Sequence, residues 1–300
     1  MTRPAPARSS SRVAVAVLAG LLAMLLYGAQ FVISRWSLQR TLSPWDLAAL
    51  RFTVAGLCLL PLLARHGLAT AAGIGWRRAI VLGITVGAPY TLVLFGGLAL
   101  APAAHGAVII PGVTPVVSML LVWLWFGERP RAVNALGLAV IVVGLVLVSA
   151  TGAGDAAPLA WAGDLLFFAA GVLWACFTVL ARRWQVDPTR GTAVVWVLAL
   201  AYVPVYAAFA GARLLAAPRG EVLFQAIYQG VGVAILALFF YTWAIRVLGP
   251  AFASLFMPLI PVFGVLLAIP VLGEIPSALQ LVGMAAVTAG LAVAASARRT

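Results

Sequence analysis

The sequence contains no lysine and few of the side chains that enzymes use for catalysis. Its 300 residues include seven Asp or Glu, two His and two Cys, and only 9% are charged. His66 and His105 do not form the HExxH spacing of a zinc hydrolase, and no acid pair or Ser–His–Asp set falls at helix depth. Cys58 and Cys176 lie inside expected helices and give no disulfide or metal framework. We therefore expect no catalytic residues, no cofactor and no metal site.

Long apolar runs make up most of the chain. It is 64% hydrophobic, with a mean hydropathy of +1.13, an excess that points to lipid as the solvent. A membrane-spanning helix needs about 20 mostly apolar residues. We expect ten such helices, at residues 13–34, 44–65, 78–98, 103–126, 132–150, 160–182, 190–210, 222–245, 250–272 and 277–296. The predicted fold class is an all-α integral membrane protein.

The second half of the chain repeats the first with a shift of 146 positions. The Gly-Glu-X-Pro sequence at 127–130 recurs at 273–276, and 13 of 39 positions are identical between 107–145 and 253–291. A fixed period of this kind indicates a duplicated module. Five helices fall in each unit. Because five is odd, the second unit must enter the membrane from the opposite side, so we predict two inverted five-helix repeats around a central cavity.

The arginines predict how the chain is oriented. With the N-terminus in the cytoplasm, fourteen arginines fall in cytoplasmic segments and four in outer segments, which follows the positive-inside rule. The net charge of +12 is thereby explained without a nucleic-acid partner. Arg-only, Ala-rich usage suggests a bacterial protein. We expect an N-terminal cytoplasmic tail at 1–12, a first repeat at 13–150, a linker at 151–158, a second repeat at 159–296 and a cytoplasmic C-terminal tail at 297–300.

Proline pairs mark the fourth and ninth expected helices. Pro111 and Pro115 lie near the middle of one, and Pro258 and Pro261 near the middle of the other. Proline removes a backbone donor and displaces the carbonyl four residues earlier, which includes that of Ser254. Such carbonyls are tolerated where they are buried in protein or line a wet cavity. Matching interruptions in two halves indicate a transporter's binding site, and a packing kink is the alternative.

Polar and aromatic residues in other helices are expected to line the same cavity. Gln30 lies on a small and polar stripe of the first helix, and Tyr90 and Trp174 lie near the middle of the third and sixth. A glutamine facing lipid would leave its amide unpaired, so it must face protein or water. The eighth helix places six residues on one face at helical spacing: Gln225, Gln229, Gly232, Leu236, Phe240 and Trp243. Such a cavity suits a solute with an apolar body and a polar end.

Three charged residues are candidates for a structural or gating role. Arg51 lies about two turns below the outer end of the second helix, where it can snorkel outwards or form an ion pair. Glu128 and Glu274 each precede a helix that starts with proline, where a carboxylate stabilises the positive helix end, and a gate latch is the alternative. His105 is expected at a cap or at the surface. Since no acid lies at mid-depth, we expect facilitated movement, or coupling through an unusual group such as His105.

Five stretches of the sequence carry a family resemblance. They are Gly28 to Phe31, Pro44 to Phe52, Pro115 to Pro130, Gly163 to Arg183 and Pro261 to Glu274. Together they resemble the drug/metabolite transporter superfamily in its EamA-type, ten-helix branch, over residues 13–296. The resemblance implies an inner-membrane carrier that works by alternating access. Within the branch the chain is similar to YddG-like exporters of amino acids.

The resemblance also narrows the expected cargo. It implies export or facilitated transport of neutral or aromatic amino acids and related metabolites, with lipid and a small-molecule substrate as the only partners and a monomer as sufficient. Efflux of multiple cationic drugs is the alternative. The small multidrug relatives carry a membrane Glu in the first helix, where this chain has Tyr27 and Gln30. Phosphate-carrying relatives use cavity Lys or Arg, and this chain offers Arg51 alone. A channel is a less favoured alternative.

Overall fold

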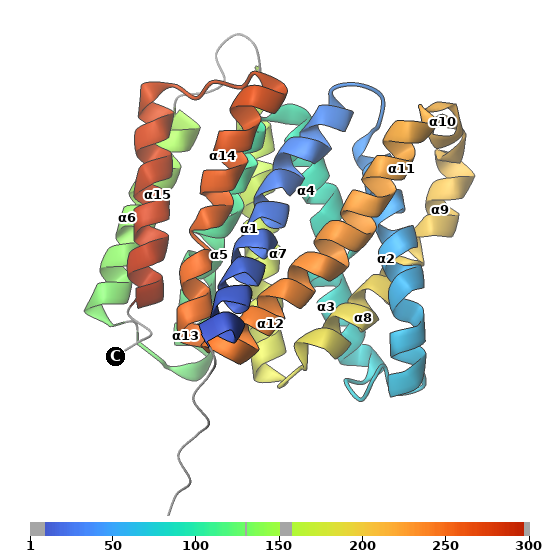
Figure 1. The fold of residues 1–300 in the computed structure, drawn as a ribbon, viewed down its shortest axis with the longest axis horizontal. Coiled ribbons are helices and arrows are strands. Elements are labelled where there is room, and N and C mark those ends of the chain that lie inside the picture. Colours follow the sequence, from blue (N-terminus) through green and yellow to red (C-terminus); the bar gives the residue numbers. More distant parts are fainter. Residues whose placement is uncertain (1–9, 130, 151–157, 297–300) are drawn as a thin grey trace, which may run out of the picture.

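The computed structural model describes residues 10–129, 131–150 and 158–296. Over these ranges the chain is helical and contains no strand. Ten helices, three of them built from consecutive pieces, are long and apolar enough to cross a membrane, and they lie side by side in one bundle (Figure 1). The ten predicted spans are therefore confirmed. Most of the expected N-terminal tail and linker, and all of the C-terminal tail at 297–300, lie outside the described residues.

The elements follow the predicted division into two halves. The first half contains α1 (Ser10–Leu38), α2 (Pro44–His66), α3 (Trp76–Val86), α4 (Ala88–Leu100), α5 (Ala103–Phe126) and α6 (Ala132–Ala150). The second contains α7 (Ala160–Arg183), α8 (Pro188–Ala199), α9 (Tyr202–Phe209), α10 (Gly211–Ala216), α11 (Arg219–Ile227), the π-helix η2 (Tyr228–Ala237), α12 (Leu238–Leu248), α13 (Pro250–Ala253), the 3₁₀ helix η3 (Ser254–Phe256), α14 (Leu259–Leu272) and α15 (Ala278–Ser296).

Several helix starts are set by local capping. At α2, Ser43 and Asp46 form a capping box, in which Asp46 accepts from the Ser43 N–H at 2.7 Å and Ser43 accepts from the Asp46 N–H at 3.3 Å. At α8, Asp187 accepts from the Arg190 N–H at 2.9 Å. A proline follows each cap at the first helical position, where its missing N–H costs nothing. These acids are the helix-start residues that their sequence context predicts.

The two halves lie in opposite directions in the bundle. The turn after α5, which contains Glu128, lies at the lower end in Figure 1, and the turn after α14, which contains Glu274, lies at the upper end. Likewise α1 begins at the lower end and α7 at the upper end. This arrangement is consistent with the predicted pair of inverted repeats, since equivalent turns of an inverted pair must face opposite sides of the membrane.

Helices α6 and α15 pack through glycines that are equivalent in the two halves. A β-carbon on Gly137 would lie 3.0 Å from the carbonyl oxygen of Gly290, and one on Gly144 would lie 2.6 Å from that of Gly283. The 146-residue shift relates Gly137 to Gly283 and Gly144 to Gly290, so the two contacts are reciprocal. A two-fold axis in the membrane plane produces this pattern. The close approach of the backbones is the usual role of small residues between membrane helices.

The predicted proline interruptions are only half correct. Helix α5 continues unbroken through Pro111 and Pro115, because a membrane helix tolerates proline where neighbouring protein satisfies the freed backbone groups. The ninth span is broken between η3 and α14, next to Pro258. Here the Ser254 carbonyl accepts from the Met257 N–H at 3.3 Å. A tightened turn therefore satisfies this carbonyl, which we had expected to be released.

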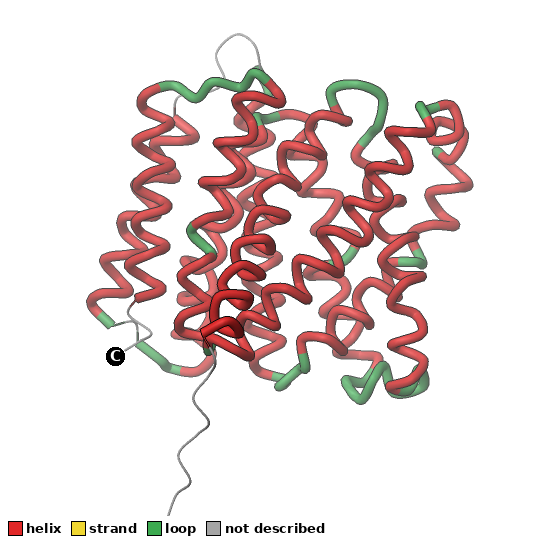
Figure 2. The backbone as a smooth tube through the Cα atoms, in the orientation of Figure 1, coloured by secondary structure: helices red, strands yellow, loops and turns green. Residues whose placement is uncertain are grey.

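A matched pair of irregularities occurs instead in the third and eighth spans. Gly87 separates α3 from α4 just before Pro89, and η2 turns the middle of the eighth span into a π-helix. Val233, which is 146 positions after Gly87, lies inside η2. Figure 2 shows the break between α3 and α4 as a short loop at mid-depth. Irregular backbone at related positions of two repeats is typical of transporter binding sites.

We predict that Gly144→Ala lowers the melting temperature of the detergent-solubilised protein, because the added methyl group collides with the Gly283 carbonyl. Overpacking of this kind costs about 1–3 kcal/mol. Gly220→Ala is the matched control, since a β-carbon there meets nothing within 4 Å. Equal melting temperatures for the two variants would contradict the assignment of this helix contact.

Candidate functional site

A network of buried polar side chains joins α1, α2 and the eighth span. Gln229 donates to Ser34 at 2.8 Å and to Gln225 at 3.1 Å, and Gln225 donates to Ser37 at 2.8 Å. Arg51 on α2 donates from Nη2 to the side-chain oxygen of Gln229. All five side chains are at most 2% exposed. The network therefore lies in the interior of the bundle, where each polar group depends on protein partners.

Arg51 does not snorkel outwards as one sequence interpretation allowed. It is 2% exposed, and its guanidinium carbon lies 4.7 Å from the centre of the Phe95 ring on α4. The hydroxyls of Tyr27, Tyr90 and Tyr228 lie near enough to interact with it electrostatically. The close approach of α4 and η2 to α2 turns the side chain inward, which the sequence of α2 alone does not encode.

Aromatic rings lie next to this network. Tyr90 on α4 and Trp174 on α7 have ring centres 5.2 Å apart, and Phe177 lies 5.9 Å from Trp174. Tyr90 is 7% exposed, whereas Trp174 is only partly buried. The structure thus brings two predicted cavity residues from different repeats into contact, and it joins them to Arg51 through the Tyr90 hydroxyl.

The predicted stripe along the eighth span is wrong in its second half. Gln225 and Gln229 are fully buried, but Leu236 is 40% exposed. The reason is η2, because a π-helix has more residues per turn than an α-helix and rotates every side chain that follows it. Phe240 and Trp243 are half-buried in α12. They are not held on the glutamine face by the α-helical spacing that predicted it.

The remaining predicted cavity residues are distributed over three spans. Gln30 is 6% exposed on α1, one turn before Ser34. Pro258 and Pro261 are buried in the ninth span, and Ser254 is half-buried there. Pro111 and Pro115 are half-buried in α5. Their common role as a cavity lining stays a prediction.

Glu274 forms a buried junction at the upper end of the bundle. It accepts from Arg35 Nε on α1 and, at 2.8 Å, from the backbone N–H of Ala103 at the start of α5. Arg35 Nη1 also donates to the Leu98 carbonyl of α4 at 2.6 Å. The carboxylate therefore stabilises the N-terminus of α5. Its own following helix, α15, is capped by Ser277 and Gln280 instead, which corrects the sequence interpretation.

Glu128 forms the corresponding pair at the lower end. Arg182, in the last turn of α7, donates to it at 2.8 Å, with both side chains more than half exposed. The Arg35 and Glu274 side chains are 11% and 15% exposed. Each glutamate thus pairs with an arginine near the C-terminal end of the other repeat's first helix. The arginines escaped prediction because nothing in the sequence relates them to a turn so far along the chain.

His105 is buried, and its expected surface position is wrong. It is 1% exposed, and its ring contacts Asp164 on α7 at 2.9 Å and Gln280 on α15 at 2.9 Å. The Gln280 oxygen accepts from the Ser277 N–H, so the amide nitrogen must donate to His105 Nε2. Consequently Nδ1 carries the proton and donates to Asp164. This network holds α5, α7 and α15 together at the end where Glu274 lies.

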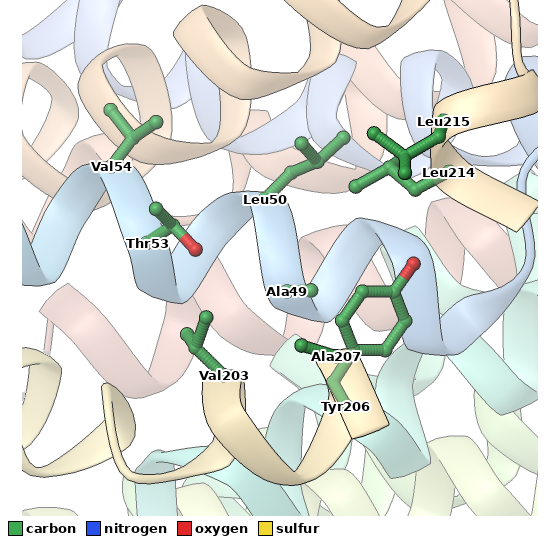
Figure 3. Close-up of a pocket in the computed structure, with 9 residues that line it drawn as sticks. All are labelled: Ala49, Leu50, Thr53, Val54, Val203, Tyr206, Ala207, Leu214 and Leu215. Carbon is green, nitrogen blue, oxygen red and sulfur yellow. The ribbon is translucent and has the colours of Figure 1, made fainter. Parts of the chain in front are cut away.

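A separate apolar pocket of about 500 Å³ lies between α2, α9 and α10 (Figure 3). It is lined by Ala49, Leu50, Thr53, Val54, Val203, Tyr206, Ala207, Leu214 and Leu215. None of the predicted cavity residues belongs to it, and Arg51 points from a different face of α2 by helical periodicity. Leu215 at its edge is 89% exposed, so this pocket suits surrounding lipid better than a polar solute.

Comparison with known proteins identifies the family. The profile of the EamA-like transporter family matches residues 14–150 and, again, residues 161–296. The chain belongs to the EamA-like transporter family. Its ten apolar helices and its transporter relatives support a multi-pass inner-membrane protein.

Three curated relatives and one structure illustrate the similarity. This EamA-like chain is 24% identical to the "Probable amino-acid metabolite efflux pump" of Salmonella typhimurium, over 90% of this chain and 91% of that one. It is 25% identical to the transporter YyaM of Bacillus subtilis, over 89% of each. It is 26% identical to the inner membrane transporter YedA of Escherichia coli, over 85% and 82%. A solved crystal structure matches with a TM-score of 0.61 and 28% identity, over 93% and 97%.

We predict that Glu274→Gln and Glu128→Gln differ strongly in their effect on stability. Removing one member of a buried ion pair costs about 3 kcal/mol, whereas an exposed pair contributes less than about 1 kcal/mol. Thermal unfolding in detergent should therefore show a large fall for Glu274→Gln and little change for Glu128→Gln. The two positions are equivalent in the repeats, so each substitution serves as the control for the other. Similar losses would contradict the difference in burial.

Proposed function

We propose that this EamA-like protein is an alternating-access carrier that exports, or facilitates the movement of, neutral or aromatic amino acids and related small metabolites. The carrying observation is the crossed pair of contacts between the repeats, Arg35 with Glu274 and Arg182 with Glu128. They lie at opposite ends of the bundle, on either side of the polar and aromatic interior. A carrier needs one closure at each end of its site, and only one closure must hold at a time.

The difference between the two contacts supports this mechanism. The Glu274 contact is buried and ties α1, α4, α5 and the turn after α14 together. The Glu128 contact is exposed and joins α7 to the turn after α5. Equivalent contacts with unequal burial are expected when one end is closed and the other is looser. Exchange of these roles between the ends would expose the interior to each side in turn.

The interior favours a solute with an apolar body and a polar end. Tyr90 and Trp174 offer an aromatic surface, and Arg51 and Gln229 offer polar groups one helix away. One relative is named as an amino-acid metabolite efflux pump, which agrees with this chemistry. Cationic drug efflux is the alternative, and the positive charge of Arg51 in the interior opposes it because like charges repel across a low dielectric.

Topology and coupling form part of the proposal. Helices α1 and α15 begin and end at the same end of the bundle, which the arginine bias assigns to the cytoplasm. The described acids all lie near helix ends or in turns, so we expect movement down the solute gradient without an obligatory proton. One chain contains both repeats and is expected to act as a monomer.

Counterflow in proteoliposomes tests the proposal. Purified protein should exchange labelled phenylalanine or leucine for unlabelled amino acid, with saturation and without an imposed pH gradient. Tyr90→Ala and Trp174→Ala should lower this exchange about tenfold, since a buried aromatic contact contributes about 1–2 kcal/mol.

Trp161→Ala is the matched control, because Trp161 is on the same helix as Trp174 but is 62% exposed. It should leave exchange unchanged. Absence of exchange for every amino acid would refute the proposed cargo, voltage-driven currents would favour a channel, and strict dependence on a pH gradient would refute simple facilitation. Unchanged exchange in both aromatic variants would remove Tyr90 and Trp174 from the site.

A further inference from the structure

Two polar atoms in the interior of the bundle have no hydrogen-bond partner. They are Arg51 Nε on α2 and Thr91 Oγ1 on α4, and their residues are 2% and 0% exposed. Buried polar atoms are nearly always paired, so each exception requires an explanation. The two residues belong to packed helices, since the Arg51 guanidinium lies over the ring of Phe95 on α4. Thr91 lies one helical turn before Phe95, on the same face.

The charge of Arg51 also lacks an acidic partner. Among the described residues, every Asp or Glu is engaged elsewhere, and none bonds to Arg51: Asp46 with Ser43 and Tyr206, Glu128 with Arg182, Asp164 with His105, Asp187 with the N-terminus of α8, Glu221 with Thr41 and Glu274 with Arg35. Arginine stays protonated in proteins. A buried cation without a counter-charge is costly in hydrocarbon, so this position is suited to an anion that comes and goes.

The groups around Arg51 limit what this anion can be. Phe95 covers one face of the guanidinium, and the Gln229 oxygen accepts from Nη2. A single free Nε–H edge remains next to the Thr91 hydroxyl. One carboxylate matches this set, because its two oxygens accept from a guanidinium and a hydroxyl together. A phosphate with two charges would bring more acceptors than the described donors can satisfy.

We propose that Arg51 and Thr91 bind the carboxylate of the transported solute inside the bundle. Tyr90, which directly precedes Thr91, carries the aromatic contact to Trp174, so a solute held at both places has a carboxylate at one end and an apolar or aromatic body at the other. This inference rests on the proposed function and sharpens it: the substrate class is the monocarboxylate with a hydrophobic side chain, which includes zwitterionic amino acids. The solute reaches Arg51 when the helices separate.

The test measures discrimination by the functional group. Phenylalanine, phenylalaninamide and phenethylamine share the aromatic body, and only the first has a carboxylate. Wild-type protein should exchange phenylalanine and be competed poorly by the other two. Arg51→Gln should weaken competition by phenylalanine about tenfold to a hundredfold, which is the loss expected for a buried bond to a charged group. Thr91→Val keeps the shape of the side chain and should cause a smaller loss in the same direction.

Controls separate this inference from folding and from the proposed function. Arg40→Gln removes an equal charge from an exposed arginine that stacks on Trp36, and it should change nothing. If Arg51→Gln does not fold, Arg51→Lys and Thr91→Val carry the test, since both keep the charge. Equal competition by phenylalanine and its amide, or an unchanged preference in folded Arg51 and Thr91 variants, would overturn the carboxylate site while leaving amino-acid transport in place.

A second measurement covers the case in which no amino acid is exchanged. Thermal stabilisation of the wild-type protein by phenylacetate, with phenylacetamide as the uncharged comparison, reports carboxylate binding without transport. Stabilisation by the acid alone, lost in Arg51→Gln or Thr91→Val, would support the site even if the proposed cargo failed. Stabilisation by neither compound, together with no exchange, would overturn both.

Discussion

In the interior of a membrane protein, every polar group must be met by another group of the protein or by its ligand. The arrangement of the helices follows from this constraint at three places. Gln229 and Gln225 are satisfied by serines on α1, Glu274 by Arg35 and the start of α5, and His105 by Asp164 and Gln280. Arg51 is only partly satisfied, and this incomplete pairing distinguishes it from the structural polar groups.

The two repeats depend on each other because each supplies what the other lacks. The first repeat gives Arg35 to the turn of the second, and the second gives Arg182 to the turn of the first. Gly137 and Gly144 meet Gly290 and Gly283 in the same crossed manner. Neither repeat can bury its own turn or its own glycine face. A structure with such reciprocal contacts can change shape by moving one repeat against the other, while the contacts inside each repeat persist.

Sequence reasoning succeeded where the signal was local or periodic. Apolar length located the spans, the Gly-Glu turns revealed the duplication, and Ser43 with Asp46 marked a helix start. It failed where a neighbouring helix decided the outcome. Pro111 and Pro115 do not break α5, η2 rotates the second half of the eighth span, and His105 is buried by helices that lie far from it in sequence. The cavity residues could be proposed singly, but not as a set with known contacts.

The amino-acid sequence by itself determined the solvent, the number of spans and the repeat, because hydrophobic length and self-similarity are properties of the chain read in order. Only the tertiary structure decided which polar groups meet. Arg35 and Glu274 are 239 positions apart, and Arg51 and Gln229 are 178 apart, so no local pattern encodes either pair. Whether an intramembrane arginine anchors to the surface or turns inward depends on which helices pack against it, and that is settled by the assembly of both repeats.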